Sequence, residues 1–382
     1  MNSPSLYQLI SVPLAVSLSW TLLFHESGRA DPFAEPETWA RYDVGHDGDP
    51  SNDFVLQPGP PGSWDAWCYY PSVVNVAGVY RMWYTGWDGS QTRIGLATSV
   101  NGAVWTKYDV GSDGDHSNDY LIQGYGASVL HDGGLYRMWY GSPSTLDMKY
   151  AESPDGITWT EHGTVLERGG LGAWDSSDCS WGSVVKDGAA YRMWYGGRGP
   201  STSYSIGYAV SVDGIHWEKY DVGSNTNPAD DMVLGAGPAG AWDSQGVNDP
   251  TVVRLGNEWH MWYQGWQAPG QPIRIGHATS ADGVSWVKYD RFADADSSND
   301  FVLDVGVSGA WDHDYVWSPW VLAEGTTVRM WYTGWSDTNP GRQIGYAAIG
   351  VIPEPFSIAF IGSAFVGVVA YRFRRRRRHG GK

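Results

Sequence analysis

Short runs of β-branched and aromatic residues alternate with polar turns through the middle of the chain. The tripeptide Met-Trp-Tyr occurs five times, at spacings of 55 to 69 residues. Self-similarity of this kind is the signature of a repeat architecture. The pattern therefore predicts five copies of one structural unit, centred on Trp83, Trp139, Trp194, Trp262 and Trp331.

Each copy contains the pattern of four short strands. In the first copy a β-branched run at residues 72–74 precedes the Met-Trp-Tyr strand, and a third run follows at residues 94–98. An Asn-Gly or Asp-Gly turn then leads to a strand that begins with Trp. Such dipeptides favour tight hairpins, because both central residues of a type I′ turn need positive φ. Four antiparallel strands per repeat make the blade of a β-propeller.

The last copy stops after its third strand, at residues 344–347. The missing fourth-strand pattern stands at the start of the region, as Trp39-Ala40-Arg41-Tyr42-Asp43. We expect this N-terminal strand to complete the last blade, which closes the ring and removes free sheet edges. The sequence thus predicts an all-β, five-bladed β-propeller with four-stranded blades over residues 31–350.

Composition and charge restrict the classes of function that the chain can have. The chain of 382 residues holds 23 Trp and 50 Gly, which suits aromatic strands and tight turns. Its formal charge is −17, and residues 31–350 alone carry −23, because the last eleven residues hold seven basic ones. Phosphates would repel so acidic a domain, so we expect no nucleic-acid partner. Cys68 and Cys179 occupy the same position in non-neighbouring repeats, so we expect free thiols.

The N-terminal 30 residues predict export. An apolar run at residues 9–24 is followed by Gly28-Arg29-Ala30, which places small residues at the positions that a signal peptidase requires. We therefore assign residues 1–30 to a signal peptide.

The C-terminal segment, residues 351–382, predicts membrane sorting. Pro353-Glu354-Pro355 precedes an apolar stretch at residues 356–371 and an arginine cluster at residues 372–378. The stretch is short for a transmembrane helix, but snorkelling arginines can complete it and would stay cytoplasmic. This order resembles the PEP-CTERM sorting signal of Gram-negative bacteria. The resemblance implies an exosortase-type processing protease, membrane attachment before processing, and delivery to the cell envelope surface or extracellular matrix.

Ligand chemistry is expected at the mouth of the central channel, beside the innermost strands. Aligned positions on these strands hold unlike polar and aromatic residues, as expected of a binding site. Aromatic faces beside carboxylates suit sugar rings, whereas the alternative is that the aromatic residues are core. The column consists of Tyr70, Gly126, Trp181, Asp249 and Ser318, and from it and the position before it we select Tyr70, Trp181, Asn248 and Trp317 as carbohydrate-binding residues.

The Ser-x-Asp-Gly-x-x-Trp hairpins, the Tyr-x-Met-Trp-Tyr strands and Asn248-Asp249-Pro250 resemble the arabinanase, levansucrase and invertase superfamily of glycosidases. The resemblance implies that the funnel binds or hydrolyses a carbohydrate or exopolysaccharide, with Asp249 as base or nucleophile. Hydrolysis needs a second carboxyl, for which we expect Asp178 or Asp314. The superfamily's usual acid, a Glu before Gly-Pro or Pro, is missing from the inner strands. A non-catalytic matrix, adhesion or carbohydrate-binding module therefore stays open.

Two further acidic patterns recur. The Asp of a repeated Trp-Asp motif (Asp65, Asp175, Asp243 and Asp312) is expected to be structural, because it appears around the ring. An Asp-x-Asp-x-Ser-x-Asp pattern matches the start of a calcium loop, yet Asp and Ser also cap turns, so the sequence leaves both readings open and indicates no other cofactor. This pattern comprises Asp47, Asp49 and Asp53, then Asp113, Asp115 and Asp119, then Asp294, Asp296 and Asp300.

Overall fold

The computed structural model describes residues 38–111, 114, 117–200, 202–222, 227–291 and 296–350. The signal peptide and the sorting segment expected from the sequence lie outside these residues, as do Asp113, Asp115 and Asp294. Within the described ranges, no helix has the length and apolar character needed to cross a membrane.

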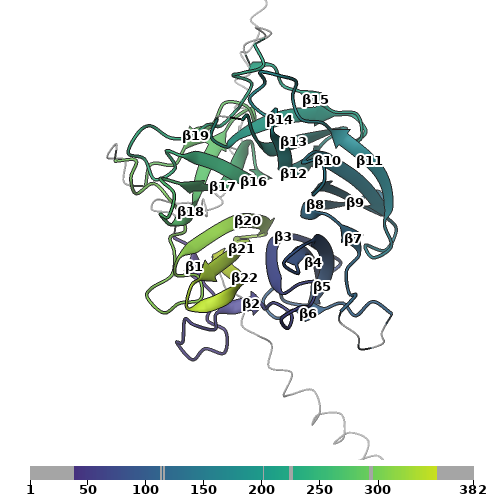
Figure 1. Ribbon diagram of the computed structural model, residues 1–382, viewed down its shortest axis with the longest axis vertical. Coiled ribbons are helices and arrows are strands. Elements are labelled where there is room, and N and C mark those ends of the chain that lie inside the picture. The colour runs from purple at the N-terminus through teal and green to yellow at the C-terminus, as the bar shows by residue number, and fades with distance from the viewer. Residues whose placement is uncertain are drawn as a thin grey trace, which may run out of the picture. The chain divides into compact units, whose positions relative to one another are not determined.

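The described chain forms five antiparallel β-sheet blades in a ring (Figure 1). Blade one comprises β3 (Trp67–Val76), β4 (Val79–Trp87), β5 (Thr92–Ser99) and β6 (Thr106–Lys107), with β7 (Ile122–Gln123) beside β5. Blade two comprises β8 (Tyr125–Asp132), β9 (Leu135–Gly141), β10 (Met148–Ser153) and β11 (Thr160–Leu166). Blade three comprises β12 (Asp178–Asp187), β13 (Ala190–Arg198), β14 (Ser205–Ser211) and β15 (Glu218–Lys219). Blade four comprises β16 (Gly246–Leu255), β17 (Glu258–Trp266), β18 (Ile273–Ser280) and β19 (Val287–Lys288).

The N-terminal strand completes blade five, as the sequence predicts. This blade comprises β20 (Tyr315–Glu324), β21 (Thr327–Ser336), β22 (Asn339–Ile349) and β1 (Ala40–Arg41). β1 pairs antiparallel with β22, with Ala40 opposite Ala348, and β2 (Phe54–Leu56) pairs with another part of β22. The predicted fold, including its closure, is therefore confirmed.

The Met-Trp-Tyr tryptophans join each blade to the next. All five are fully buried, and four of them donate their indole N–H to the carbonyl of a hairpin glycine in the following blade. In the fourth blade Trp262 packs against Trp39 of the N-terminal segment edge to face, with ring centroids 6.0 Å apart. The four hydrogen bonds run from Trp83 to Gly156 (3.0 Å), Trp139 to Gly214 (2.8 Å), Trp194 to Gly283 (2.7 Å) and Trp331 to Gly102 (2.7 Å).

The inner strands β3, β8, β12, β16 and β20 surround the centre of the ring (Figure 1). Hydroxyl groups tie neighbouring inner strands together. For example, the backbone N–H of Val129 donates to Ser72 Oγ at 3.0 Å, and that of Val184 donates to Ser128 Oγ at 3.0 Å. These contacts hold the walls of the central channel at fixed positions.

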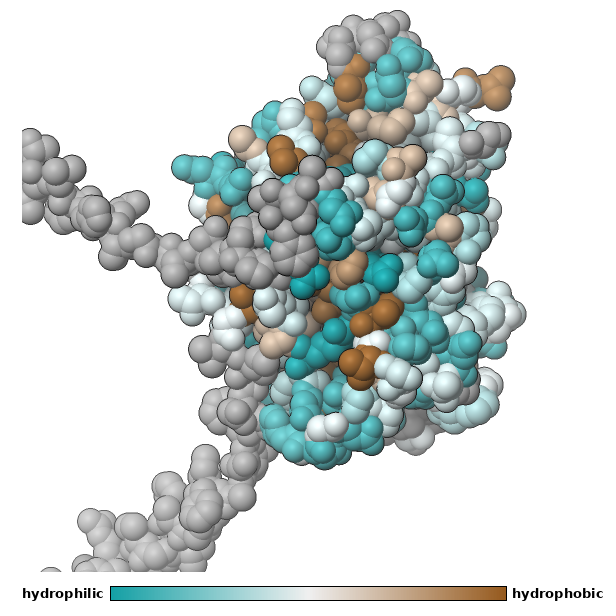
Figure 2. Space-filling model, turned by 90° about the vertical axis from the view of Figure 1, so that its left-hand side faces the viewer, coloured by the Kyte–Doolittle hydropathy of each residue, from teal (hydrophilic) through white to brown (hydrophobic). Residues whose placement is uncertain are grey.

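Five hydrophobic clusters fill the spaces between neighbouring blades. Cys68 and Cys179 are buried free thiols, as expected. Figure 2 shows one side of the molecule, where hydrophilic residues dominate and hydrophobic ones form small separate groups. The apolar side chains of the blades are thus used mainly for packing between sheets.

Candidate functional site

Every inner strand carries a β-bulge at the same position. The pairing of each inner strand with its neighbour shifts there, for example between Tyr69 and Ser72 in β3 and between Asn248 and Thr251 in β16. A bulge changes the direction of a side chain. A residue other than glycine lowers the stability of the fold by about 1 kcal/mol or more when its backbone lies in the left-handed region. The bulge residues all have positive φ: Tyr70 (53°), Gly126 (58°), Trp181 (53°), Asp249 (49°) and Ser318 (50°).

These five bulge residues are the column that the sequence alignment of the repeats selects. They line one cavity together with residues that follow them on the inner strands, including Pro71, Pro250 and Pro319. The cavity has a volume of about 30 Å³, which is room for one or two water molecules. The strained backbone thus gathers one side-chain position from each blade around a small space.

Asp249 is the only carboxylate among the residues that line this cavity, and it is 5% exposed. Ser318 donates its hydroxyl to Asp249 Oδ2 at 2.6 Å, whereas Asp249 Oδ1 has no hydrogen-bond partner among the described residues. Burial raises the pKa of Asp249 to about 7, and the negative charge of Asp178 adds to this, although the Ser318 hydrogen bond opposes it. Asp249 can therefore hold a proton near neutral pH.

Asp178 lies at the start of β12, 2% exposed, and interacts electrostatically with Asp249. Its two oxygens accept hydrogen bonds from Ser180 Oγ at 2.6 Å and from the Tyr204 hydroxyl at 3.1 Å. Burial raises the pKa of Asp178, but these two hydroxyls and the nearby Arg198 favour the charged form. Because Asp178 has more groups that stabilise its charge, we expect Asp249 to be the one of the two that is protonated near neutral pH.

Of the other two carboxylates predicted as catalytic, only Asp178 contributes to the electrostatics of Asp249. Asp314 precedes β20 and accepts a hydrogen bond from the backbone N–H of Asp337 at 2.8 Å. It is partly exposed and does not line the Asp249 cavity. The contact indicates that Asp314 caps a turn at the rim of blade five.

Three of the predicted binding residues lie at the Asp249 cavity: Tyr70 and Trp181 line it, and Asn248 precedes Asp249 in β16. The Trp181 ring centroid lies 6.3 Å from that of Tyr70 and 5.6 Å from that of Tyr204, and its indole N–H has no described partner. Asn248 is 3% exposed, and its Oδ1 is likewise without a donor. Gly196 makes room for Asn248, because a Cβ there would lie 1.7 Å from Asn248 Oδ1. Unsatisfied buried polar groups are costly, so these atoms suit a bound ligand or water.

A second, larger pocket adjoins the first. Its volume is about 520 Å³, and Tyr70 lines both cavities. Most of its wall is aromatic, and none of the lining residues is acidic. We name it the Arg342 pocket; it is lined by Trp67, Tyr70, Gln264, Ile273, Tyr315, Trp317, Trp335, Gly341 and Arg342.

Sequence reasoning found Tyr70 and Trp317 of this pocket but missed most of the others. Trp67 and Tyr315 stand three residues before the bulge residue, the same aligned position as Asp178. This aligned position, three residues before the bulge, could therefore have indicated Trp67 and Tyr315 as pocket residues. Arg342 lies in β22 and offers no comparable pattern.

The Trp-Asp carboxylates are structural, as their repetition indicates. Each is at most 3% exposed and accepts a hydrogen bond from a buried Tyr hydroxyl of the second strand. Each also binds a cation of the outer strand. The pairs are Asp65 with Lys107 (2.5 Å), Asp175 with Lys219 (2.5 Å), Asp243 with Lys288 (2.6 Å) and Asp312 with Arg41 (2.9 Å).

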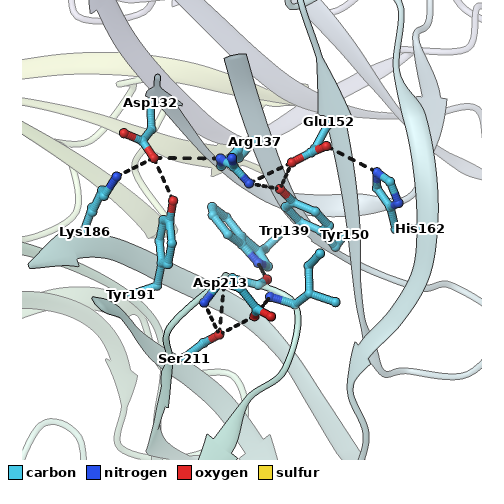
Figure 3. Close-up of polar contacts among 12 residues, drawn as sticks. Asp132, Arg137, Trp139, Tyr150, Glu152, His162, Lys186, Tyr191, Ser211 and Asp213 are labelled. Atoms are coloured by element: carbon cyan, nitrogen blue, oxygen red, sulfur yellow. Dashed lines mark hydrogen bonds and ion pairs between the residues drawn. The ribbon is translucent and has the colours of Figure 1, made fainter. Parts of the chain in front are cut away.

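Figure 3 shows a polar network in blades two and three, in which Asp132 accepts hydrogen bonds across the blades from Lys186 at 2.6 Å and from the Tyr191 hydroxyl at 2.7 Å. Arg137 donates to the Tyr150 hydroxyl at 2.6 Å and to Glu152 at 2.7 Å. Arg192 donates in the same way to Tyr208 at 2.8 Å. Because equivalent arginines make equivalent contacts in several blades, the network serves blade packing.

The first Asp-rich loop, which is fully described, uses its carboxylates as turn caps. Asp47 Oδ1 accepts from the backbone N–H of Asp49 at 2.8 Å, and Asp53 Oδ1 accepts from that of Val44 at 2.8 Å. Asp119 and Asp300 accept from backbone N–H groups nine residues earlier in the same manner. Asp296 Oδ1 accepts from the backbone N–H of Ser298 at 3.1 Å. Among the described residues, no group of three or more His, Cys, Asp or Glu could hold a metal ion.

Comparison with known proteins supplies the relationships of the chain. No family model matches it. It is 30% identical over 234 residues to the uncharacterized Mycobacterium tuberculosis protein Rv1502. This match covers 55% of this chain and 71% of Rv1502. The chain belongs to the same family as Rv1502. A shorter match links it to a β-1,2-mannobiose phosphorylase of Thermoanaerobacter, with 30% identity over 105 residues, 24% of this chain and 31% of the phosphorylase.

Solved structures agree on the fold. A glycosyl hydrolase from Bacteroides ovatus superposes with a TM-score of 0.60 at 17% identity, covering 82% of this chain and 93% of its own. A second structure comes from work on the GH130 family of mannoside phosphorylases, which contains glycoside hydrolases that target β-1,2 mannosidic linkages in Candida mannan. It also has a TM-score of 0.60 at 17% identity, covering 84% of this chain and 96% of its own. The Rv1502-family chain thus has the propeller fold of these glycosidases.

Proposed function

We propose that this protein is a carbohydrate-active propeller that cleaves a glycosidic bond at the mouth of its central channel. The observation that carries the proposal is the pair of Asp249 and Asp178, two buried and interacting carboxyls beside unpartnered polar atoms at the centre of the ring. Paired carboxyls with unequal proton affinity are what glycoside cleavage requires. The likeness to glycosidase propellers and to a β-1,2-mannobiose phosphorylase supports this class of substrate.

Asp249 fits the role of general acid. A pKa of about 7 leaves a large protonated fraction at neutral pH, and such a group can protonate a leaving oxygen. This differs from the base or nucleophile role that the sequence resemblance implies for Asp249. Asp178, held in its charged form by Ser180 and Tyr204, would then activate the attacking water or phosphate, or stabilise the positive charge of the transition state.

The experiment measures sugar release from β-1,2-mannobiose and from a panel of other oligosaccharides, with and without inorganic phosphate. We expect Asp249→Asn and Asp178→Asn each to lower kcat by about 100-fold or more, the usual contribution of acid–base catalysis. Asp314→Asn is the matched control, because it changes a carboxyl outside the cavity in the same way. Release that depends on phosphate identifies a phosphorylase, and release without it a hydrolase.

A non-catalytic carbohydrate-binding propeller is the second candidate, and the size of the two cavities favours it. The Asp249 cavity holds only about 30 Å³, whereas the aromatic Arg342 pocket holds about 520 Å³. The Arg342 pocket therefore offers the larger space for a sugar ring. Binding of an oligosaccharide without cleavage, unchanged by Asp249→Asn, would select this function.

We also propose that the protein is exported and sorted to the envelope surface. The support is the sequence of residues 1–30 and 351–382, which match a signal peptide and a PEP-CTERM segment read by an exosortase-type protease. Antibody labelling of intact cells tests this, and an exclusively cytoplasmic signal would contradict it.

A further inference from the structure

Arg342 stands out among the charged residues of this acidic propeller. Its guanidinium carbon lies 4.6 Å from the Trp67 ring centroid, 5.1 Å from that of Tyr69 and 5.3 Å from that of Trp317. It makes no ion pair or hydrogen bond with any residue that the structure describes. Arg93, by contrast, binds Asp88 at 2.6 Å. The three rings hold the cation in place and leave it without a counter-ion.

Cation–π contacts do not use the N–H groups of an arginine. The guanidinium carries five donors in a planar fork that matches a carboxylate. Because no lining residue of the Arg342 pocket is acidic, a counter-ion for this cation can come only from an anion that enters the pocket. An anion bound in this way gains a charge-assisted, bidentate contact.

Gln264 sets a second requirement for a ligand of the same pocket. It lines the wall, is 9% exposed, and its amide oxygen has no donor among the described residues. A ligand hydroxyl would satisfy this acceptor. The aromatic walls favour a ligand that also has an apolar face. The stacked rings of Tyr315 and Trp335, with centroids 5.3 Å apart, form one such wall.

We propose that the Arg342 pocket is a subsite for an acidic sugar, whose carboxylate binds Arg342 while its ring stacks on the aromatic wall and a hydroxyl reaches Gln264. A uronic acid supplies the anion, the hydroxyl donor and the apolar C–H face in one residue, whereas a neutral sugar leaves Arg342 without a counter-ion. Tyr70 lines both this pocket and the Asp249 cavity, so the acidic sugar would lie next to the bond that is cleaved. This inference rests on the proposed carbohydrate function and makes its substrate class an anionic polysaccharide.

Binding to the full chain, followed by tryptophan fluorescence and calorimetry, tests the proposal. The probes are cellobiouronic acid, its neutral counterpart cellobiose, and sodium phosphate. We expect the acidic disaccharide to bind about tenfold more tightly than cellobiose, in keeping with a charge-assisted bidentate contact. Arg342→Gln should remove this preference and Arg342→Lys should retain part of it. Arg254→Gln is the matched control, since it removes an arginine that binds Asp187 at 2.8 Å and does not line the pocket.

Equal affinity for the two disaccharides, or a preference that survives Arg342→Gln, would overturn the proposal. Binding of phosphate with no preference for the acidic disaccharide would also overturn it, because the cation would then serve a free anion. The binding experiment is repeated on Asp249→Asn, so it does not depend on turnover. Arg342-dependent binding without any cleavage would remove the catalytic proposal and leave this one standing.

Discussion

Asp249 combines a strained backbone, deep burial and an unpartnered oxygen at one residue. The positive φ lowers the stability of the fold by about 1 kcal/mol or more. The missing hydrogen bond to the buried oxygen lowers it by a similar amount. Residues that function demands are commonly retained at such a cost. The other bulge residues also have positive φ, but among the five only Asp249 carries a carboxylate.

The pKa of Asp249 predicts how stability depends on pH. Its folded pKa of about 7 exceeds the value near 4 that an unfolded Asp has. The unfolded state therefore loses its proton first as the pH rises, and the protein loses stability between about pH 4 and pH 7. We expect Asp249→Asn to match the wild type near pH 4 and to be more stable near pH 8, by at most about 4 kcal/mol.

Urea denaturation of both proteins at the two pH values measures this difference. Asp314→Asn serves as the control, and its offset from the wild type should stay nearly constant with pH. An Asp249→Asn offset that does not change with pH would show that folding does not raise the pKa of Asp249, which would also remove the general-acid role.

At the scale of elements, the same side-chain roles recur from blade to blade. The hairpin glycines accept the Met-Trp-Tyr indoles, the Trp-Asp carboxylates bind an outer-strand cation, and the Asp-rich loops end the outer strands. Such repetition identifies a residue as structural, and departures from it mark the candidates for function. Asp178 and Trp67 illustrate this, since they occupy the same aligned position in different blades with different chemistry.

The Asp-rich loops provide a prediction about metal removal. In the first loop Asp47, Asp49 and Asp53 already accept backbone N–H groups, so the loop is held without an ion. We expect EDTA to leave the Tm unchanged and added calcium to have no effect beyond that of ionic strength. Differential scanning calorimetry measures the Tm under both conditions. A Tm that calcium raises and EDTA lowers, in a manner abolished by Asp49→Asn, would instead establish calcium binding.

At the scale of the whole molecule, ring closure depends on contacts between the two ends of the domain. β1 hydrogen-bonds to β22, Trp39 packs on Trp262, and Arg41 binds Asp312. Without these contacts the last blade would keep an open edge, and Asp312 would be left buried beside the Tyr332 hydroxyl alone.

Removing the Arg41 charge tests this closure. Asp312 is 1% exposed, and breaking a buried ion pair leaves an uncompensated charge that costs about 3 kcal/mol. We expect Arg41→Met to lower the free energy of unfolding by that order, and a second change, Asp312→Asn, to recover part of it. Lys219→Met, which breaks the equivalent pair within blade three, is the control and should cost a similar amount. An unchanged urea midpoint in Arg41→Met would mean that the N-terminal strand does not close the ring.

The sequence by itself determined the blade count, the four-strand unit, the closing strand and the column of bulge residues. These features are periodic and local, so hairpin turns and aligned repeats reveal them without any long-range contact. Only the tertiary structure showed that Asp178 rather than Asp314 affects the electrostatics of Asp249, because that depends on which way each side chain points at the end of its strand. It also decided that Arg342, near the end of the domain, lies against Trp67 and Tyr69 near its start. Ring closure makes these segments neighbours, and no pattern along the chain records where a closed ring brings two distant side chains together.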